Sequence, residues 1–150
     1  MTTVLCSTFT LANTAPVETK KAEAAPASGL INIITRPEIM GLWGMEIPAN
    51  KQCVEYYNFR QNNEVVIKSA KEWSIGQYQY QPQNNRSEQL PALVMQIKYD
   101  NNEVDCSGVQ NDQAGEVQHF FVKWVNKEQI QFCASNNGEN CFATLNRSLP

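Results

Sequence analysis

The chain has 150 residues, 42% of them hydrophobic, with 12 Lys and Arg against 15 Asp and Glu and a formal net charge of −3. This composition is that of one globular domain with enough apolar residues for a core. The basic residues stand singly or in pairs and create no basic field for a phosphate backbone, so we expect no nucleic-acid binding. No apolar run approaches the ~20 residues of a membrane-spanning helix, so no membrane span is expected.

The first 29 residues differ in composition from the rest of the chain. Residues 4–12 are uncharged, apolar and small, as in a secretory signal peptide, although a basic start is missing. We therefore expect residues 1–15 to be a truncated signal peptide, with a polar tail as the alternative. Residues 16–29 are rich in Ala, Pro, Glu, Lys and Thr and are expected to be a flexible linker. Residues 30–150 then form one domain, which we expect to be periplasmic or secreted.

The chain has five cysteines, of which Cys6 falls in the predicted signal segment. The other four form an even set, which predicts two disulfides in an exported chain. Three pairings are possible. Cys133 and Cys141 flank a turn-rich stretch between two predicted strands, which favours a local bridge, and Cys53–Cys106 follows by elimination. The closely spaced cysteine pairs of a thiolate zinc site are missing, so no metal is predicted.

From residue 41 onward, short segments with period-two alternation are separated by Asn, Gly and Pro, a pattern typical of β-strands. Several joins have hairpin length, which favours sequential antiparallel pairing. A capping signal, Thr35-Arg36-Pro37-Glu38, predicts a short helical turn before the first strand. The predicted strands are 41–47, 53–60, 64–70, 73–81, 92–99, 103–106, 118–125, 129–134 and 141–146.

These joins predict an all-β domain, either a small barrel or a sandwich. We favour a small antiparallel up-and-down β-barrel of about eight strands, because closure leaves no open sheet edge. Tyr99 is expected on the same face as Leu93, Met95 and Ile97. The residues expected to face the interior are bulky, namely Trp43, Phe59, Trp73, Leu93, Met95, Ile97, Phe120, Trp124, Phe132 and Leu145.

The opening strand contains Gly41-Leu42-Trp43, and Arg147 follows the last predicted strand. This combination resembles the lipocalin-like (calycin-type) small secreted β-barrels. The resemblance implies that Gly41 lets the first strand begin close to the barrel floor. It also implies that Arg147 lies on the Trp43 ring, a cation–π contact worth ~1 kcal/mol. The chain is shorter than a typical lipocalin and has no long helix after the last strand, so its own side chains can fill the shallower barrel.

No constellation of catalytic residues is found, and we expect a protein without enzymatic activity or cofactor. His119, the single histidine, is expected to face outward, opposite to Phe120. Ser107 lacks the Gly-x-Ser-x-Gly elbow of serine hydrolases. The acidic stretch 100–105 departs from an EF-hand loop because Val104 stands where an oxygen ligand is needed.

Aromatic side chains beside amides can stack on a ligand or form a protein-binding surface. Tyr78 and Tyr80 share one face of their predicted strand, and glutamines occupy the other. The alternative reading is that the tyrosines belong to the core. The candidate ligand-binding residues are Tyr57, Trp73, Tyr78, Tyr80, Met95 and Trp124.

We therefore expect a monomeric, exported, lipocalin-like binding protein of the bacterial cell envelope that takes a small apolar or amphipathic ligand. The alternative is a protein-binding module, such as an inhibitor of a wall-degrading enzyme or an immunity-type protein. It would bind an envelope protein through loops 82–91 and 107–117. The acidic residues Asp105, Asp112 and Glu116 would then oppose a basic enzyme.

Overall fold

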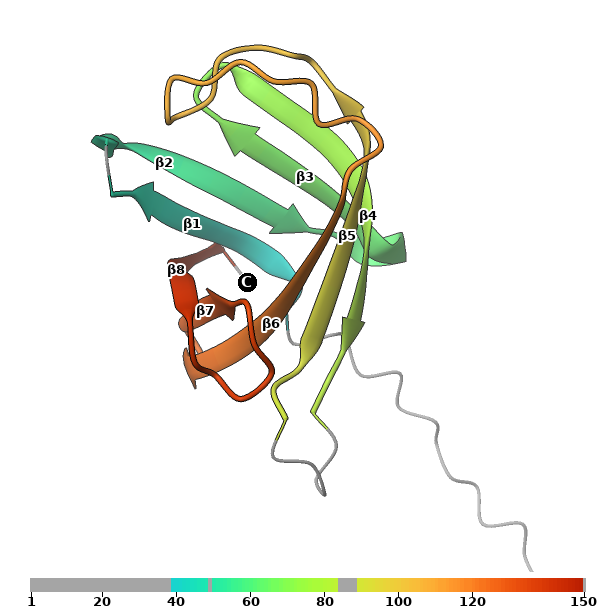
Figure 1. Cartoon of the computed structure of the whole chain (residues 1–150), viewed down its shortest axis with the longest axis vertical. Coiled ribbons are helices and arrows are strands. Elements are labelled where there is room, and N and C mark those ends of the chain that lie inside the picture. The colour runs from blue at the N-terminus through green and yellow to red at the C-terminus, as the bar shows by residue number, and fades with distance from the viewer. Residues whose placement is uncertain (1–38, 49, 84–88, 150) are drawn as a thin grey trace, which may run out of the picture. The chain divides into compact units, whose positions relative to one another are not determined.

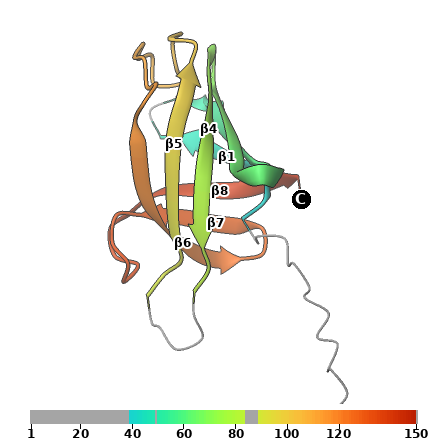
Figure 2. The ribbon, with the colours of Figure 1, turned by 90° about the vertical axis from the view of Figure 1, so that its right-hand side faces the viewer.

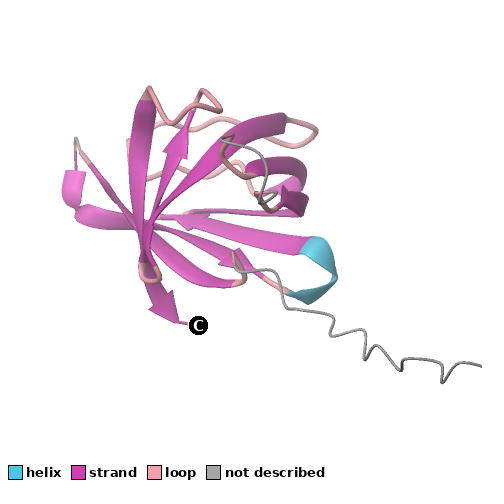
Figure 3. Ribbon diagram, turned by 90° about the horizontal axis from the view of Figure 1, so that it is seen from below, coloured by secondary structure: helices cyan, strands magenta, loops and turns pink. Residues whose placement is uncertain are grey.

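The computed structural model describes residues 39–48, 50–83 and 89–149, all within one compact unit, Thr35–Pro150. Within these residues, eight strands form a closed antiparallel barrel in which each strand pairs with the next and β8 pairs with β1 (Figures 1 and 3). The predicted up-and-down barrel is confirmed. The strands are β1 (Gly41–Ile47), β2 (Asn50–Phe59), β3 (Glu64–Ser69), β4 (Glu72–Gln81), β5 (Ala92–Asp100), β6 (Val117–Asn126), β7 (Gln129–Cys133) and β8 (Cys141–Leu149), and a 3₁₀ turn, η1 (Gln61–Asn63), joins β2 to β3.

One predicted strand, 103–106, is wrong. Val104 forms only an isolated bridge with Gln110. The Asp105 carboxylate accepts hydrogen bonds from the backbone N–H groups of Ser107 and Val109, both at 2.8 Å, and so turns the chain. The other predicted strands are present, with ends shifted by a few residues. The predicted signal segment, linker and helical turn at 35–38 lie outside the described residues.

Inward-facing side chains pack against one another inside the barrel. Phe132 lies at the centre of this packing, with its ring centroid 5.6 Å from that of Tyr57 and 4.9 Å from that of Phe120. Such contacts add to the apolar burial that stabilises the fold. The buried cluster comprises Ile39, Trp43, Tyr57, Phe59, Val65, Ile67, Tyr78, Leu93, Met95, Ile97, Val122, Ile130, Phe132 and Leu145.

At one end of the barrel, which we call the floor, Trp43 is fully buried beneath Arg147. The indole Nε1 donates a hydrogen bond to the Ile39 carbonyl at 2.8 Å, and the Arg147 Cζ lies 4.1 Å from the ring centroid. The guanidinium also donates to the Met40 carbonyl at 2.8 Å. Gly41 has φ 127°, which L side chains rarely adopt. The expected contact between Arg147 and Trp43 is confirmed, although Arg147 lies within β8 and not after it.

The prediction that Tyr99 faces inward is wrong because β5 contains a bulge. Between Ile97 and Tyr99 the register of β5 against β4 shifts by one residue. The alternation of side chains reverses there, so that Tyr99 is 49% exposed. Gly76 is required opposite the bulge, because a Cβ would lie 2.4 Å from the Gln96 carbonyl oxygen.

Trp73 also faces outward, against the prediction. In β4 the buried positions are Glu72, Ser74, Gly76 and Tyr78, so alternation places Trp73 on the outer face. Its ring packs against that of Tyr99, with centroids 5.0 Å apart. The acidic residue, and not the neighbouring aromatic one, faces the interior at this end of the strand.

Both predicted disulfides are present. Cys53–Cys106 joins β2 to loop 101–116, and Cys133–Cys141 joins the end of β7 to the start of β8. Two disulfides are typical of an oxidising compartment outside the cytoplasm. None of the helices in the described residues is long and apolar enough to cross a membrane.

Candidate functional site

Three of the six predicted ligand-binding residues are core residues. Tyr57, Tyr78 and Met95 are 8%, 4% and 0% exposed. The Tyr57 hydroxyl donates to Glu55 at 2.5 Å, and the Tyr78 hydroxyl donates to the Arg60 carbonyl at 3.1 Å. The hydroxyl groups of Tyr57 and Tyr78 thus form hydrogen bonds within the fold, as expected if these tyrosines belong to the core.

The other three predicted residues lie elsewhere. Tyr80 and Trp124 are half-buried at the edge of the core, where the indole Nε1 donates to the Tyr80 hydroxyl at 3.0 Å. Trp73 lies on the outer face. The six residues therefore do not form one common pocket.

The described residues of the two loops proposed for protein binding, 82–91 and 107–117, lie at opposite ends of β5. Residues 82–83 and 89–91 lie before its start, whereas loop 101–116 follows its end (Figure 2). The described residues of the two loops therefore do not belong to one surface. The acidic residues singled out from the sequence all lie in loop 101–116, which covers the end of the barrel that we call the roof (Figure 1).

Four carboxylates gather at the roof, namely those of Glu55, Glu72, Asp100 and Asp105. Glu72 and Asp100 are 5% and 8% exposed, and both face inward. Burial, and then the charges of Asp100, Asp105 and Glu55, raise the pKa of Glu72 to about 7. Gln113 opposes this shift by donating a hydrogen bond to Glu72 Oε1 at 3.1 Å. No ion pair to these carboxylates is present in the described part of the chain.

Hydrogen bonds satisfy most of these carboxylate oxygens. Glu55 accepts from the Tyr57 hydroxyl and, at 2.8 Å, from the Ser69 hydroxyl. Burial and the nearby Glu55 charge raise the pKa of Tyr57. Asp100 Oδ1 accepts from the Asn102 N–H at 2.6 Å, but the buried Asp100 Oδ2 has no partner among the described residues. A buried acceptor without a donor is costly and is uncommon in folded proteins.

Loop 101–116 is held to the strands beneath it. Cys106 is bonded to Cys53, and its N–H donates to the Ser69 hydroxyl at 3.0 Å. The Val104 carbonyl accepts from two N–H groups at the start of β4, each at 3.2 Å. Ile97 exchanges backbone hydrogen bonds with the C-terminal part of the loop, both at 2.9 Å. The loop is therefore an ordered cover.

Sequence reasoning missed Glu72 and Asp100 as site residues. Alternation along β4 could have identified Glu72. Every second residue counted back from the inward Tyr78 faces the same side, and Glu72 is one of these residues. No comparable signal existed for Asp100, because the bulge in β5 changes the alternation just before it.

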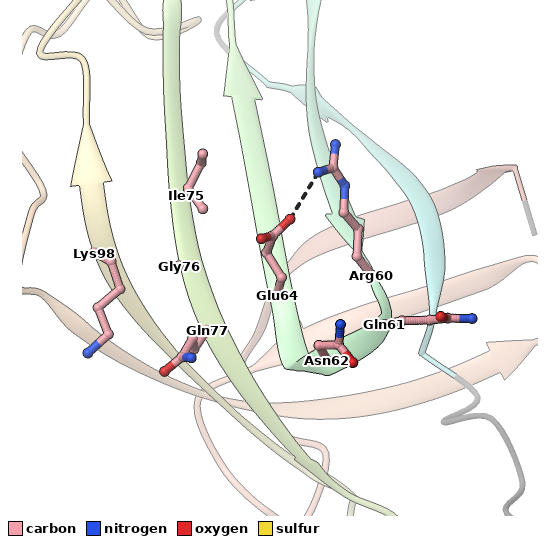
Figure 4. Close-up of a pocket in the computed structure, with 8 residues that line it drawn as sticks. All are labelled: Arg60, Gln61, Asn62, Glu64, Ile75, Gly76, Gln77 and Lys98. Carbon is pink, nitrogen blue, oxygen red and sulfur yellow. Dashed lines mark hydrogen bonds and ion pairs between the residues drawn. The ribbon is translucent and has the colours of Figure 1, made fainter.

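The described residues form several hollows on the outer surface, of which two bear on function. The first, about 620 Å³, has a lining of mixed polarity and contains the ion pair between Arg60 and Glu64, with the two atoms 2.9 Å apart (Figure 4). The second, about 520 Å³, is mostly apolar and lies over β1, β2, β3 and β8. Its lining residues are Leu42, Tyr56, Asn58, Val66, Lys68, Ser148 and Leu149.

The described residues contain no group of three or more His, Cys, Asp or Glu side chains that could hold a metal ion. His119 is exposed, as expected. No protein-family model, curated protein or solved structure matches the chain. Only the geometry of the roof therefore bears on what it could bind.

Proposed function

We propose that this chain is a non-enzymatic protein-binding module of the periplasm or the extracellular space, and that loop 101–116 contacts the partner. The observation that carries this proposal is the order of the loop, which a disulfide and backbone hydrogen bonds fix on a closed barrel. A surface that is ordered before binding loses little conformational entropy when it binds. The exposed Val109, at 55%, supplies an apolar contact at the loop surface.

Of the two functions considered from the sequence, this proposal favours the protein-binding module over a protein that holds a ligand inside the barrel. Tyr57, Tyr78 and Met95, expected to contact a ligand, are packed in the core. An inhibitor or an immunity-type protein acts through surface loops and needs no cavity. The relation to lipocalins remains a proposal that rests on Gly41, Trp43 and Arg147.

Site-specific photo-crosslinking tests the proposal. A photoreactive amino acid replaces Val109 in the loop or, as the control, the exposed Gln79 on the outer face of β4. Irradiation in an extract of the native compartment is expected to give an adduct of defined mass from position 109 only. Equal adducts from both positions, or none from position 109, would count against the loop as the binding surface.

A small amphipathic ligand is the second candidate, and the apolar hollow that contains Lys68 favours it. Native mass spectrometry of the exported protein tests this function. Extra mass that disappears on denaturation, and that Val66→Glu abolishes, would support it. A bare polypeptide mass would favour the protein-binding function.

A further inference from the structure

We propose that the roof is a docking site for a basic protein surface, whose Lys and Arg side chains compensate the carboxylates of Glu72, Asp100 and the covering loop. This inference rests on the proposed protein-binding function and names the chemical class of the partner. The roof has two layers of carboxylates: an outer layer on the exposed loop 101–116 and an inner layer that is buried beneath it.

The inner layer is short of positive charge. Among the described residues, no hydrogen-bond donor reaches the buried Asp100 Oδ2, and no cationic side chain pairs with the cluster in which Glu72 lies. Uncompensated buried carboxylates lower stability, so a protein that only had to fold would gain by replacing them. A positive charge placed above the roof would lower this cost, because the poorly solvated interior weakens the electrostatic interaction less than water does.

The outer layer carries the same sign. Loop 101–116 contains Glu103, Asp105, Asp112 and Glu116, and it contains no Lys or Arg. Glu103, Asp112 and Glu116 are exposed, and Asp105 is half-buried between the two layers. Charges of one sign that are held on an ordered loop attract a partner of the opposite sign and speed its association.

Binding of a basic partner would also be linked to protons. Glu72 is largely protonated below its pKa of about 7, and a cation above the roof favours its ionised form. Affinity for a cation is therefore expected to rise from pH 6 to pH 8. The groups that face Glu72 are Glu55 and Tyr57 from β2, Ser69 from β3, Asp100 from β5, and Asp105 and Gln113 from the loop; Lys71 beside it is exposed.

The probe for this inference is a fluorescent octalysine peptide, with octaglutamate as the control. Anisotropy is expected to show that octalysine binds and that its affinity falls as salt is added, while octaglutamate does not bind. The triple variant Asp105→Asn, Asp112→Asn, Glu116→Gln keeps the side-chain acceptors of the loop turns. It should weaken octalysine binding by about tenfold. The control Glu128→Gln removes one charge, from an exposed turn at the other end of β6, and should change the affinity for octalysine less than twofold.

A second pair of variants tests the inner layer. In a His119→Gln background, which removes the single histidine, affinity for octalysine should rise between pH 6 and pH 8. Adding Glu72→Gln should abolish that rise. Because the triple variant alters only the loop, it still tests the inference if an inner variant fails to fold.

The outcomes separate this inference from the proposed function. If Glu128→Gln weakens octalysine binding as much as the triple variant does, the roof is not the cation site and the inference fails. If position 109 gives the same adduct in wild type and in the triple variant, the loop binds a partner that is not basic. The proposed function then stands without this inference. If position 109 gives no adduct, the proposed function itself fails.

Discussion

At the floor of the barrel a buried aromatic ring lies beneath an arginine, whereas at the roof buried carboxylates lie near one another and pair with no cation of the described residues. The Arg147 guanidinium contacts the Trp43 ring and donates to the carbonyls of Met40 and Lys127. Asp100, by contrast, has one oxygen that accepts no hydrogen bond from the part of the chain that the structure describes. The floor has the features of a stable closure, whereas the roof carries an electrostatic cost that the proposed binding role would account for.

Removal of the Trp43 ring at the floor should have the largest effect on stability. Trp43→Ala is expected to lower the free energy of unfolding by ~3–5 kcal/mol, because a fully buried Trp leaves a large cavity. Chemical denaturation measures this loss. The control Trp73→Ala removes a ring that is 38% exposed and should cost less than ~1 kcal/mol. Similar losses in the two variants would mean that the floor does not organise the fold.

The two disulfides should contribute unequally. Cys53–Cys106 closes a sequence separation of 53, and Cys133–Cys141 closes one of 8. By loop-closure entropy, replacing the first pair by serines should cost about 4 kcal/mol and the second about 2.5 kcal/mol. Denaturation of the two double variants measures the difference. The reverse order would show that the roof loop is held mainly by its hydrogen bonds.

The arginine at the floor should contribute less than the ring beneath it. Arg147→Met is expected to cost about 1–2 kcal/mol, through loss of the cation–π contact and of hydrogen bonds to carbonyls. The control is Arg60→Met, which removes an ion pair whose side chains are 51% and 44% exposed. That change should cost about 0.5 kcal/mol. Equal effects would mean that the contacts of the half-buried Arg147 stabilise the fold no more than the exposed ion pair of Arg60 does.

The floor was more predictable from the sequence than the roof. Its features are local or motif-like: a Gly-x-Trp at the start of a strand and an arginine near the C-terminus. The Cys133–Cys141 bridge was similarly predictable, because a short turn-rich loop separates the two residues. The strands themselves followed from period-two alternation and hairpin-length joins.

The roof depends on details that alternation alone does not give. Because of the bulge opposite Gly76, Tyr99 faces outward and Asp100 faces inward. No pattern in the sequence predicts this bulge. Trp73 was expected inside because aromatic residues are usually buried, yet its neighbour Glu72 occupies the inward position. The charge cluster comes from β2, β4, β5 and a loop, so only the folded barrel brings it together.

The last prediction concerns the titration of Glu72. Its pKa is raised from 4.5 to about 7 in the folded protein, so the folded state holds the proton more tightly than the unfolded state does. Ionised Glu72 therefore destabilises the fold, and this effect is absent below pH 4.5 and complete above pH 7. Glu72→Gln keeps an acceptor for Gln113. At pH 4.5 its free energy of unfolding should equal that of wild type, apart from any effect of the substitution that does not depend on pH. At pH 8 it should be more stable by on the order of 1–2 kcal/mol, a figure reduced for solvent screening.

Denaturation of wild type, Glu72→Gln and Glu128→Gln at several pH values measures this difference. The control should follow wild type at every pH, because Glu128 is exposed in the turn between β6 and β7. A stability difference that does not change with pH would show that Glu72 carries no special charge cost. If the difference grows with pH, and the same variant also loses its pH-dependent affinity for octalysine, then the residue that weakens the roof is the one that binding uses. Loss of stability at a site in exchange for function there is the expected trade-off.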